Sequence, residues 1–173
     1  IRRQRQMCIR DRQNIRLKGS YIFLLIISII ALDLYTKSIA SGLDNTITLS
    51  SFIKLHTTNN YGIAFSLFDG LQDDGRLLLS IVILIILIFV AYELYKNLRS
   101  SINYLLGLSL VLGGGIANFI DRFDNGSVTD FIVVHYENIY FPAVFNIADL
   151  SISIGAMFII FHLVGMSRDS NQI

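Results

Sequence analysis

The sequence predicts an all-α membrane protein with four transmembrane helices and a small extracytoplasmic β-sheet. Of its 173 residues, 53% are hydrophobic and 16% are charged, whereas charged residues make up about a quarter of ordinary soluble domains. Four apolar stretches are each long enough to cross a bilayer as a helix, which takes about 20 residues. Little polar sequence remains for a separate soluble domain. We therefore expect one integral membrane domain over residues 19–166.

The expected spans cover residues 19–39, 77–95, 102–120 and 147–166. The second is the clearest, because it has no charge between Leu77 and Tyr92 and lipid offers backbone groups no partner outside a helix. The first span has the basic flank and apolar centre of a secretory signal peptide. Asp33 and Lys37 interrupt it, so we expect it to remain uncleaved.

The basic residues are divided unevenly between the two ends of these helices. Four spans place both termini on one side, and ten of the 14 Lys and Arg residues fall there. The positive-inside rule then predicts that the basic leader, residues 1–18, and the tail, residues 167–173, are cytoplasmic. Residues 2–12 resemble translated sequencing-adapter sequence, and without them the bias is five residues against four.

Two segments then face outward, residues 42–75 and 121–145. In the first, residues 47–49 and 53–56 alternate apolar and polar side chains, which is typical of short strands, so we expect a small sheet on the membrane surface. The second has a turn signal at residues 124–126 and then many aromatic residues. We expect it to lie at the membrane surface between the third and fourth helices.

Ionisable side chains concentrate at the outer face. Such groups are costly in or near lipid and indicate function. The polar groups do not continue through the depth of the bilayer, as a channel would require, so a site at one surface is favoured. Asp33 and Lys37 lie in the outer part of the first span, and we place Asp121 and Arg122 just past the third, Asp130 in the outer loop and Asp149 in the first turn of the fourth.

Carboxylate chemistry is the reaction type that these residues favour. Two carboxyl groups held close together share a proton, and such a pair can activate water against a carbonyl group. Asp130 and Asp149 are candidates, although other aspartates lie on the same side. A structural interpretation also stands, because Asn146 followed by Asp149 is an N-capping arrangement and capping alone accounts for that pair.

Other kinds of site find little support. Cys8 is the only cysteine, which excludes an intrachain disulfide and a Cys-rich zinc site. The three histidines show no metal-ligand spacing, so we expect no metal and no cofactor. The glycines at 113–115 favour close helix packing over phosphate binding. A net charge of +1 gives no reason to expect a nucleic-acid partner.

Five motifs in this order resemble those of lipoprotein signal peptidase, or signal peptidase II, a family of bacterial intramembrane aspartyl peptidases. They are LDLYTK (32–37), NYGIAF (60–65), GGGIANFIDR (113–122), GSVTDF (126–131) and FNIAD (145–149). The resemblance covers most of the chain after the leader. It implies a four-helix inner-membrane enzyme that removes signal peptides from diacylglyceryl-modified prolipoproteins and is inhibited by globomycin.

The resemblance also implies the roles of individual residues. Asp130 and Asp149 match the catalytic dyad. The matched residues that support the site or contact substrate are Asp33, Lys37, Asn60, Gly114, Asn118, Asp121, Arg122 and Asn146. Two positions depart from the family pattern, since Leu34 stands where glutamine is usual and Ala117 where glycine is usual. Neither departure removes a dyad carboxylate.

The expected partners are prolipoprotein substrates and membrane lipids, and we expect a monomer. The alternative is a non-enzymatic membrane protein, either a transporter subunit or a scaffold. In that protein the acidic residues would only cap helices and pair with Lys37 and Arg122. Replacing either dyad aspartate by asparagine separates the two readings, because asparagine still caps a helix but cannot share a proton.

Overall fold

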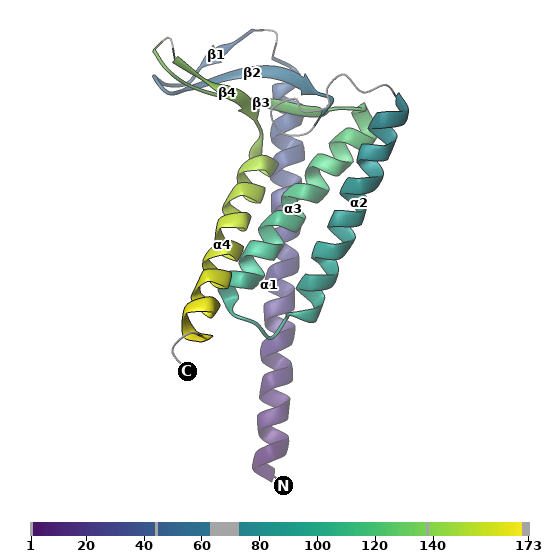
Figure 1. The fold of residues 1–173 in the computed structure, drawn as a ribbon, viewed down its shortest axis with the longest axis vertical. Helices are drawn as coiled ribbons and strands as arrows, with labels where there is room; N and C mark the ends of the chain where they lie inside the picture. Colours follow the sequence, from purple (N-terminus) through teal and green to yellow (C-terminus); the bar gives the residue numbers. More distant parts are fainter. Residues whose placement is uncertain (1, 44, 63–72, 138, 171–173) are drawn as a thin grey trace.

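The computed structural model describes residues 2–43, 45–62, 73–137 and 139–170. Within these ranges, helices form a bundle that carries a small sheet at one end (Figure 1). The helices are α1 (Arg2–Ala40), α2 (Asp73–Lys96), α3 (Ile102–Asn125) and α4 (Ile147–Ser170). Each contains a stretch long and apolar enough to cross a membrane, at residues 17–40, 75–96, 102–125 and 147–165. The four predicted spans are therefore confirmed as helices.

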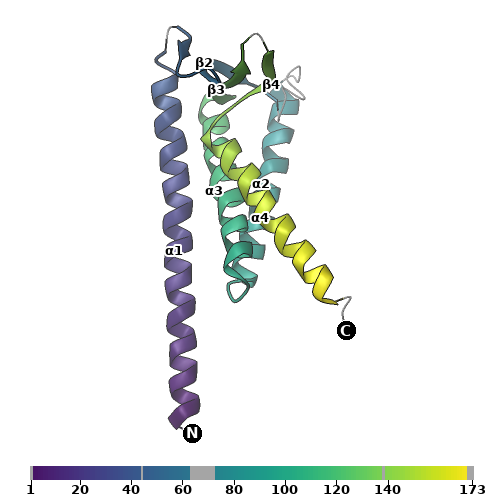
Figure 2. The ribbon, with the colours of Figure 1, turned by 90° about the vertical axis from the view of Figure 1, so that its left-hand side faces the viewer.

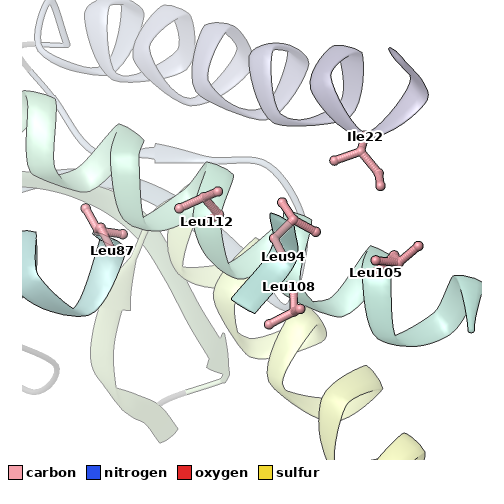
Figure 3. Close-up of a cluster of buried hydrophobic side chains, with 6 residues drawn as sticks. All are labelled: Ile22, Leu87, Leu94, Leu105, Leu108 and Leu112. Atoms are coloured by element: carbon pink, nitrogen blue, oxygen red, sulfur yellow. The ribbon is translucent and has the colours of Figure 1, made fainter. Parts of the chain in front are cut away.

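Helix α3 is the centre of the bundle, since it packs against each of the other three helices. Buried leucines of α3 meet apolar side chains of α1 and α2, as Figure 3 shows. This core cluster consists of Ile22, Leu87, Leu94, Leu105, Leu108 and Leu112. On the α4 side, Gly107 faces Gly155, and a Cβ atom at Gly107 would lie 2.9 Å from the Gly155 carbonyl oxygen. Small residues thus allow the two helix backbones to approach closely.

The sheet is antiparallel and contains strands from both outer segments. Its order is β1 (Ile47–Thr48), β2 (Ile53–Asn60), β3 (Val128–Tyr136) and β4 (Ile139–Phe145). The two predicted strands of the first segment are confirmed. The second segment, expected as a membrane-surface segment, forms β3 and β4, because β3 pairs with β2 on one side and with β4 on the other.

The pairing of β2 with β3 matters for function because it fixes which side chains meet at the helix end of the sheet. Asn60 pairs with Val128 and Thr58 with Asp130. The end of β2 therefore runs beside the start of β3, directly after α3. Figure 2 shows this junction above the helix ends, with α1 and α4 extending away from the sheet.

One predicted boundary was wrong, the end of the third span. Asp121 and Arg122 were placed beyond the third helix, but they lie inside α3, which continues to Asn125 and ends at Gly126 in the left-handed conformation (φ 71°). Both side chains are buried and paired beneath the sheet, so their charges do not require the helix to end earlier. Helix α1 also extends beyond the predicted first span, toward the N-terminus as far as Arg2.

Candidate active site

The two predicted catalytic aspartates come from different elements and line the same cavity. Asp130 lies on β3, and Asp149 lies in the first turn of α4. The cavity has a volume of about 530 Å³. Only 3% of Asp130 is exposed to solvent, so a carboxyl group there is largely withdrawn from water. The structure thus brings together two residues that are 19 positions apart in the sequence.

Asn146 connects this pair. Its Nδ2 donates to Asp130 Oδ1 at 2.6 Å, while its Oδ1 accepts from the Asp149 backbone N–H at 2.9 Å. Asp149 returns the bond, since its Oδ2 accepts from the Asn146 backbone N–H at 3.3 Å. This reciprocal arrangement is a capping box at the start of α4. The predicted capping is therefore confirmed, and the same side chain also reaches the second carboxyl group.

Each aspartate has a further asparagine donor of its own. Asn60 Nδ2 donates to Asp130 Oδ2 at 3.0 Å, and Asn118 Nδ2 donates to Asp149 Oδ1 at 2.8 Å. Asn118 Oδ1 in turn accepts from Asn146 Nδ2 at 3.1 Å. Hydrogen bonds donated to a carboxylate favour its ionised form and fix its orientation.

Lys37 is buried behind the pair, at the junction of α1 and α3. Its Nζ lies 2.7 Å from Asp33 Oδ2 and 3.2 Å from Asp121 Oδ2, and it donates to Asn118 Oδ1 at 2.7 Å. The lysine is 3% exposed, so these contacts compensate for a charge removed from water. Through Asn118, this ion cluster is connected to Asp149.

The two acidic partners of Lys37 also hold backbone groups next to the aspartate pair. Asp33 Oδ1 accepts from the backbone N–H of Ala148 at 2.8 Å, and Asp121 Oδ2 accepts from that of Thr129 at 2.7 Å. Ala148 directly precedes Asp149, and Thr129 directly precedes Asp130. The acidic residues of the first and third helices thus fix the positions of both catalytic candidates.

The remaining predicted site residues have different functions. Arg122 lines the cavity and its Nη2 donates to the carbonyl oxygen of Gly62, while its Nη1 is buried without a hydrogen-bond partner among the described residues. Gly114 packs against the backbone of Ala148, where a Cβ atom would clash. Its role is close packing of α3 with α4. The last three residues of the NYGIAF motif lie outside the described residues.

The pKa of Asp130 is raised from 3.8 to about 6, mainly by burial and to a smaller extent by the nearby charge of Asp149. Hydrogen bonds from Asn60 and Asn146 and the charge of Lys37 act in the opposite direction. Burial dominates, so Asp130 retains a proton more readily than an exposed aspartate does. Such a residue can act as the acid of an acid–base pair near neutral pH.

Most of the cavity wall is apolar, and sequence motifs did not identify it. It includes Ile83 of α2, Phe119 of α3, Phe141 of β4 and Ile152 of α4. Only Phe119 of these four belongs to a quoted motif, GGGIANFIDR, and the folded arrangement places all four below the carboxyl groups. No histidine is among the described residues of this lining; His56 contacts Thr46, and His162 contacts Ser101.

Comparisons with known proteins find similar sequences and a similar fold. The sequence profile described as signal peptidase (SPase) II matches residues 25–165. The lipoprotein signal peptidase of Wigglesworthia glossinidia brevipalpis is 38% identical over 142 residues, covering 80% of this chain and 91% of the relative. That of Mesorhizobium japonicum is 35% identical over 156 residues, covering 86% and 89%. A solved bacterial membrane enzyme superposes with a TM-score of 0.71 at 25% identity, covering 87% and 91%.

Proposed function

Because this chain belongs to the signal peptidase II family, we propose that Asp130 and Asp149 are the catalytic pair of an aspartic peptidase. The protein is a multi-pass inner-membrane peptidase that removes signal peptides from prolipoproteins. The observation that supports the catalytic assignment is the shared cavity, in which each carboxyl group is oriented by its own asparagine and both are joined by Asn146.

In the proposed reaction, Asp130 holds the proton and Asp149 is ionised. Asp149 lies in the first turn of α4, where the helix dipole favours negative charge. It takes a proton from a water molecule whose oxygen attacks the scissile carbonyl carbon. Asp130 donates its proton to the carbonyl oxygen as the tetrahedral intermediate forms. When the C–N bond breaks, the proton held by Asp149 passes to the leaving amine, and the hydroxyl proton of the intermediate returns to Asp130.

Arg122 supports substrate binding in this proposal. Its buried Nη1 lies at the cavity wall, where it can donate to a carbonyl oxygen of the substrate backbone. Asp33, Lys37 and Asp121 act further from the reacting atoms, since they hold the backbone N–H groups next to each catalytic aspartate. Gly114 allows α4 to approach α3 at that depth.

We propose that the substrate carries a diacylglyceryl group, and that its acyl chains lie along the apolar part of the cavity. The carboxyl groups are at the sheet end of the cavity, and apolar residues of α2, α3 and α4 continue below them. Each buried methylene contributes about 0.8 kcal/mol, so two acyl chains would fix the depth of the scissile bond strongly. An unlipidated precursor is then expected to be cleaved more slowly even at saturation.

The orientation that fits these functions places the sheet and the catalytic pair on the extracytoplasmic side, with both termini cytoplasmic. The charge bias of the flanks supports this, as does the position of the sheet at the end of the bundle opposite the N-terminal end of α1 and the C-terminal end of α4 (Figure 1). We also propose a monomer with residues 19–166 as its catalytic unit.

The catalytic assignment is tested with Asp130→Asn and Asp149→Asn in a cleavage assay on a diacylglyceryl-modified precursor. Asparagine preserves size and much of the hydrogen bonding but cannot share the proton, so both variants are expected to lose cleavage while remaining folded. Asp124→Asn is the matched control, because Asp124 is exposed near the end of α3. Near-normal cleavage by either dyad variant would refute the pair.

A further inference from the structure

Arg76, which belongs to none of the five motifs, contacts the ring of Tyr61 next to the site. Arg76 lies in α2, near its first turn, and its guanidinium carbon is 4.6 Å from the centroid of the Tyr61 ring. Both side chains are partly buried. A cation over an aromatic face is attracted more strongly when the pair is shielded from water. The contact therefore ties the start of α2 to the chain that follows β2.

Tyr61 lies between two residues that are themselves fixed. Asn60 Oδ1 accepts from the backbone N–H of Gly62 at 3.0 Å, and the Gly62 carbonyl accepts from Arg122. Because Oδ1 is occupied by this turn, Asn60 directs Nδ2 to Asp130, at 3.0 Å. The geometry of residues 60–62 therefore determines whether Asp130 receives this bond.

We infer that Arg76 is a positioning residue for catalysis, which holds the turn at residues 60–62 through the Tyr61 ring so that Asn60 remains bonded to Asp130. Arg76 does not line the cavity, and Ile83 is the only residue of α2 in the described lining. Arg76 therefore acts through Asn60 rather than on the substrate. The inference rests on the proposed function, because it assumes that Asp130 belongs to the catalytic pair.

This mechanism predicts a particular change in the pH profile. The bond from Asn60 lowers the pKa of Asp130. When the bond weakens, Asp130 keeps its proton to a higher pH, and the singly protonated pair persists further into the alkaline range. The alkaline limb of the kcat/KM profile is then expected to move to higher pH, in addition to any loss of rate from poorer orientation.

The test compares kcat/KM profiles of the wild type, Arg76→Gln, Arg76→Lys, Asn60→Ala and the double variant Arg76→Gln/Asn60→Ala. We expect Asn60→Ala to move the alkaline limb upward by about one pH unit. Arg76→Gln should move it in the same direction, by no more than that, and lower kcat/KM roughly tenfold. Arg76→Lys keeps a cation over the ring, so its alkaline limb and its kcat/KM should both lie close to the wild-type values. The alkaline limb of the double variant should lie at the same pH as that of Asn60→Ala alone. Both changes act through the same hydrogen bond from Asn60 to Asp130, so their effects should not add.

Lys54→Gln is the matched control, since it removes a similar contact on the sheet, where Lys54 Nζ is 5.0 Å from the Tyr140 ring centroid. It should leave the limb unchanged. The inference is overturned if Arg76→Gln leaves the limb in place, or if its shift adds to that of Asn60→Ala. Full activity of Asp130→Asn would instead refute the proposed function, so the two failures are distinguishable.

Discussion

Replacing Gly114 by alanine tests how closely α3 must approach α4 for the proposed catalytic pair to form. A Cβ atom at Gly114 would overlap the carbonyl oxygen of Ala148, and it would lie 3.2 Å from the Ala148 carbonyl carbon and 3.0 Å from Ile152 Cγ1. Two of these three atoms belong to backbone, so rotation of a side chain cannot relieve the overlap. The start of α4 must move.

The size of this effect follows from the position of the clash. Ala148 precedes Asp149 and donates its N–H to Asp33, so a movement of α4 here directly displaces a carboxyl group of the proposed catalytic pair. Catalytic groups must be held within about 0.5 Å, and a misplacement of about 1 Å costs on the order of 100-fold in rate. We expect Gly114→Ala to lower kcat about 100-fold and the free energy of unfolding by about 1–3 kcal/mol.

The assay measures kcat on a lipid-modified precursor and the unfolding of the purified protein in detergent. Gly107→Ala is the packing control, because its Cβ atom would lie 2.8 Å from Ile159 Cγ1 and 2.9 Å from the Gly155 carbonyl oxygen, in the part of the same helix interface away from the sheet. It should lower stability with a much smaller loss of kcat. The reasoning fails if Gly114→Ala retains wild-type kcat, or if the two variants lose kcat equally.

Three further predictions concern charge and topology. Lys37→Met leaves the carboxylates of Asp33 and Asp121 buried without their cation, so it should lower the free energy of unfolding by about 3–5 kcal/mol, and a loss below about 1 kcal/mol in chemical unfolding would contradict the role of the cluster. The pKa of Asp130 is raised from 3.8 to about 6, so between these pH values the native state binds more protons than the unfolded state. Stability should therefore fall as the pH rises from about 4 to about 6. In Asp130→Asn, that part of the change in melting temperature should be missing. Reporters fused after Ser101 and at the C-terminus should be cytoplasmic and one near Asp73 external, whereas an external signal at Ser101 would exclude this topology.

The helices could be predicted from the sequence because lipid leaves the backbone few alternatives, and each apolar stretch had to be a helix. The capping box at Asn146 and Asp149 was also predictable, since it depends on residues three apart in sequence. The gathering of acidic residues at the outer face was predictable too, because the position of each residue along its span gives its depth in the membrane. These features are local, or depend only on distance along a helix axis.

The features that the sequence did not predict depend on contacts between distant segments. Strand β3 exists because its backbone pairs with β2, which is about 70 residues earlier, and no local pattern at residues 128–136 indicates this partner. Helix α3 continues beyond residue 120 although Asp121 and Arg122 are charged and buried. Both side chains have partners from distant segments: Lys37 and the Thr129 backbone for Asp121, and the Gly62 carbonyl for Arg122. The bridging role of Asn146 likewise requires Asp130 to be brought close by the sheet.

The ion pair of Asp33 with Lys37 has a consequence for how the chain enters the membrane. The two residues are four apart on α1, with their charged atoms 2.7 Å apart, so the pair can form within this helix before any later helix has been synthesised. The first span therefore enters the bilayer carrying two opposite charges that neutralise each other, which is far less costly than either charge alone. Asn118 and Asp121 reach the lysine only when α3 inserts, and Ala148 reaches Asp33 only when α4 does. The first helix thus carries a preformed polar centre around which the later helices assemble, and the peptidase site is complete only after the last helix has joined.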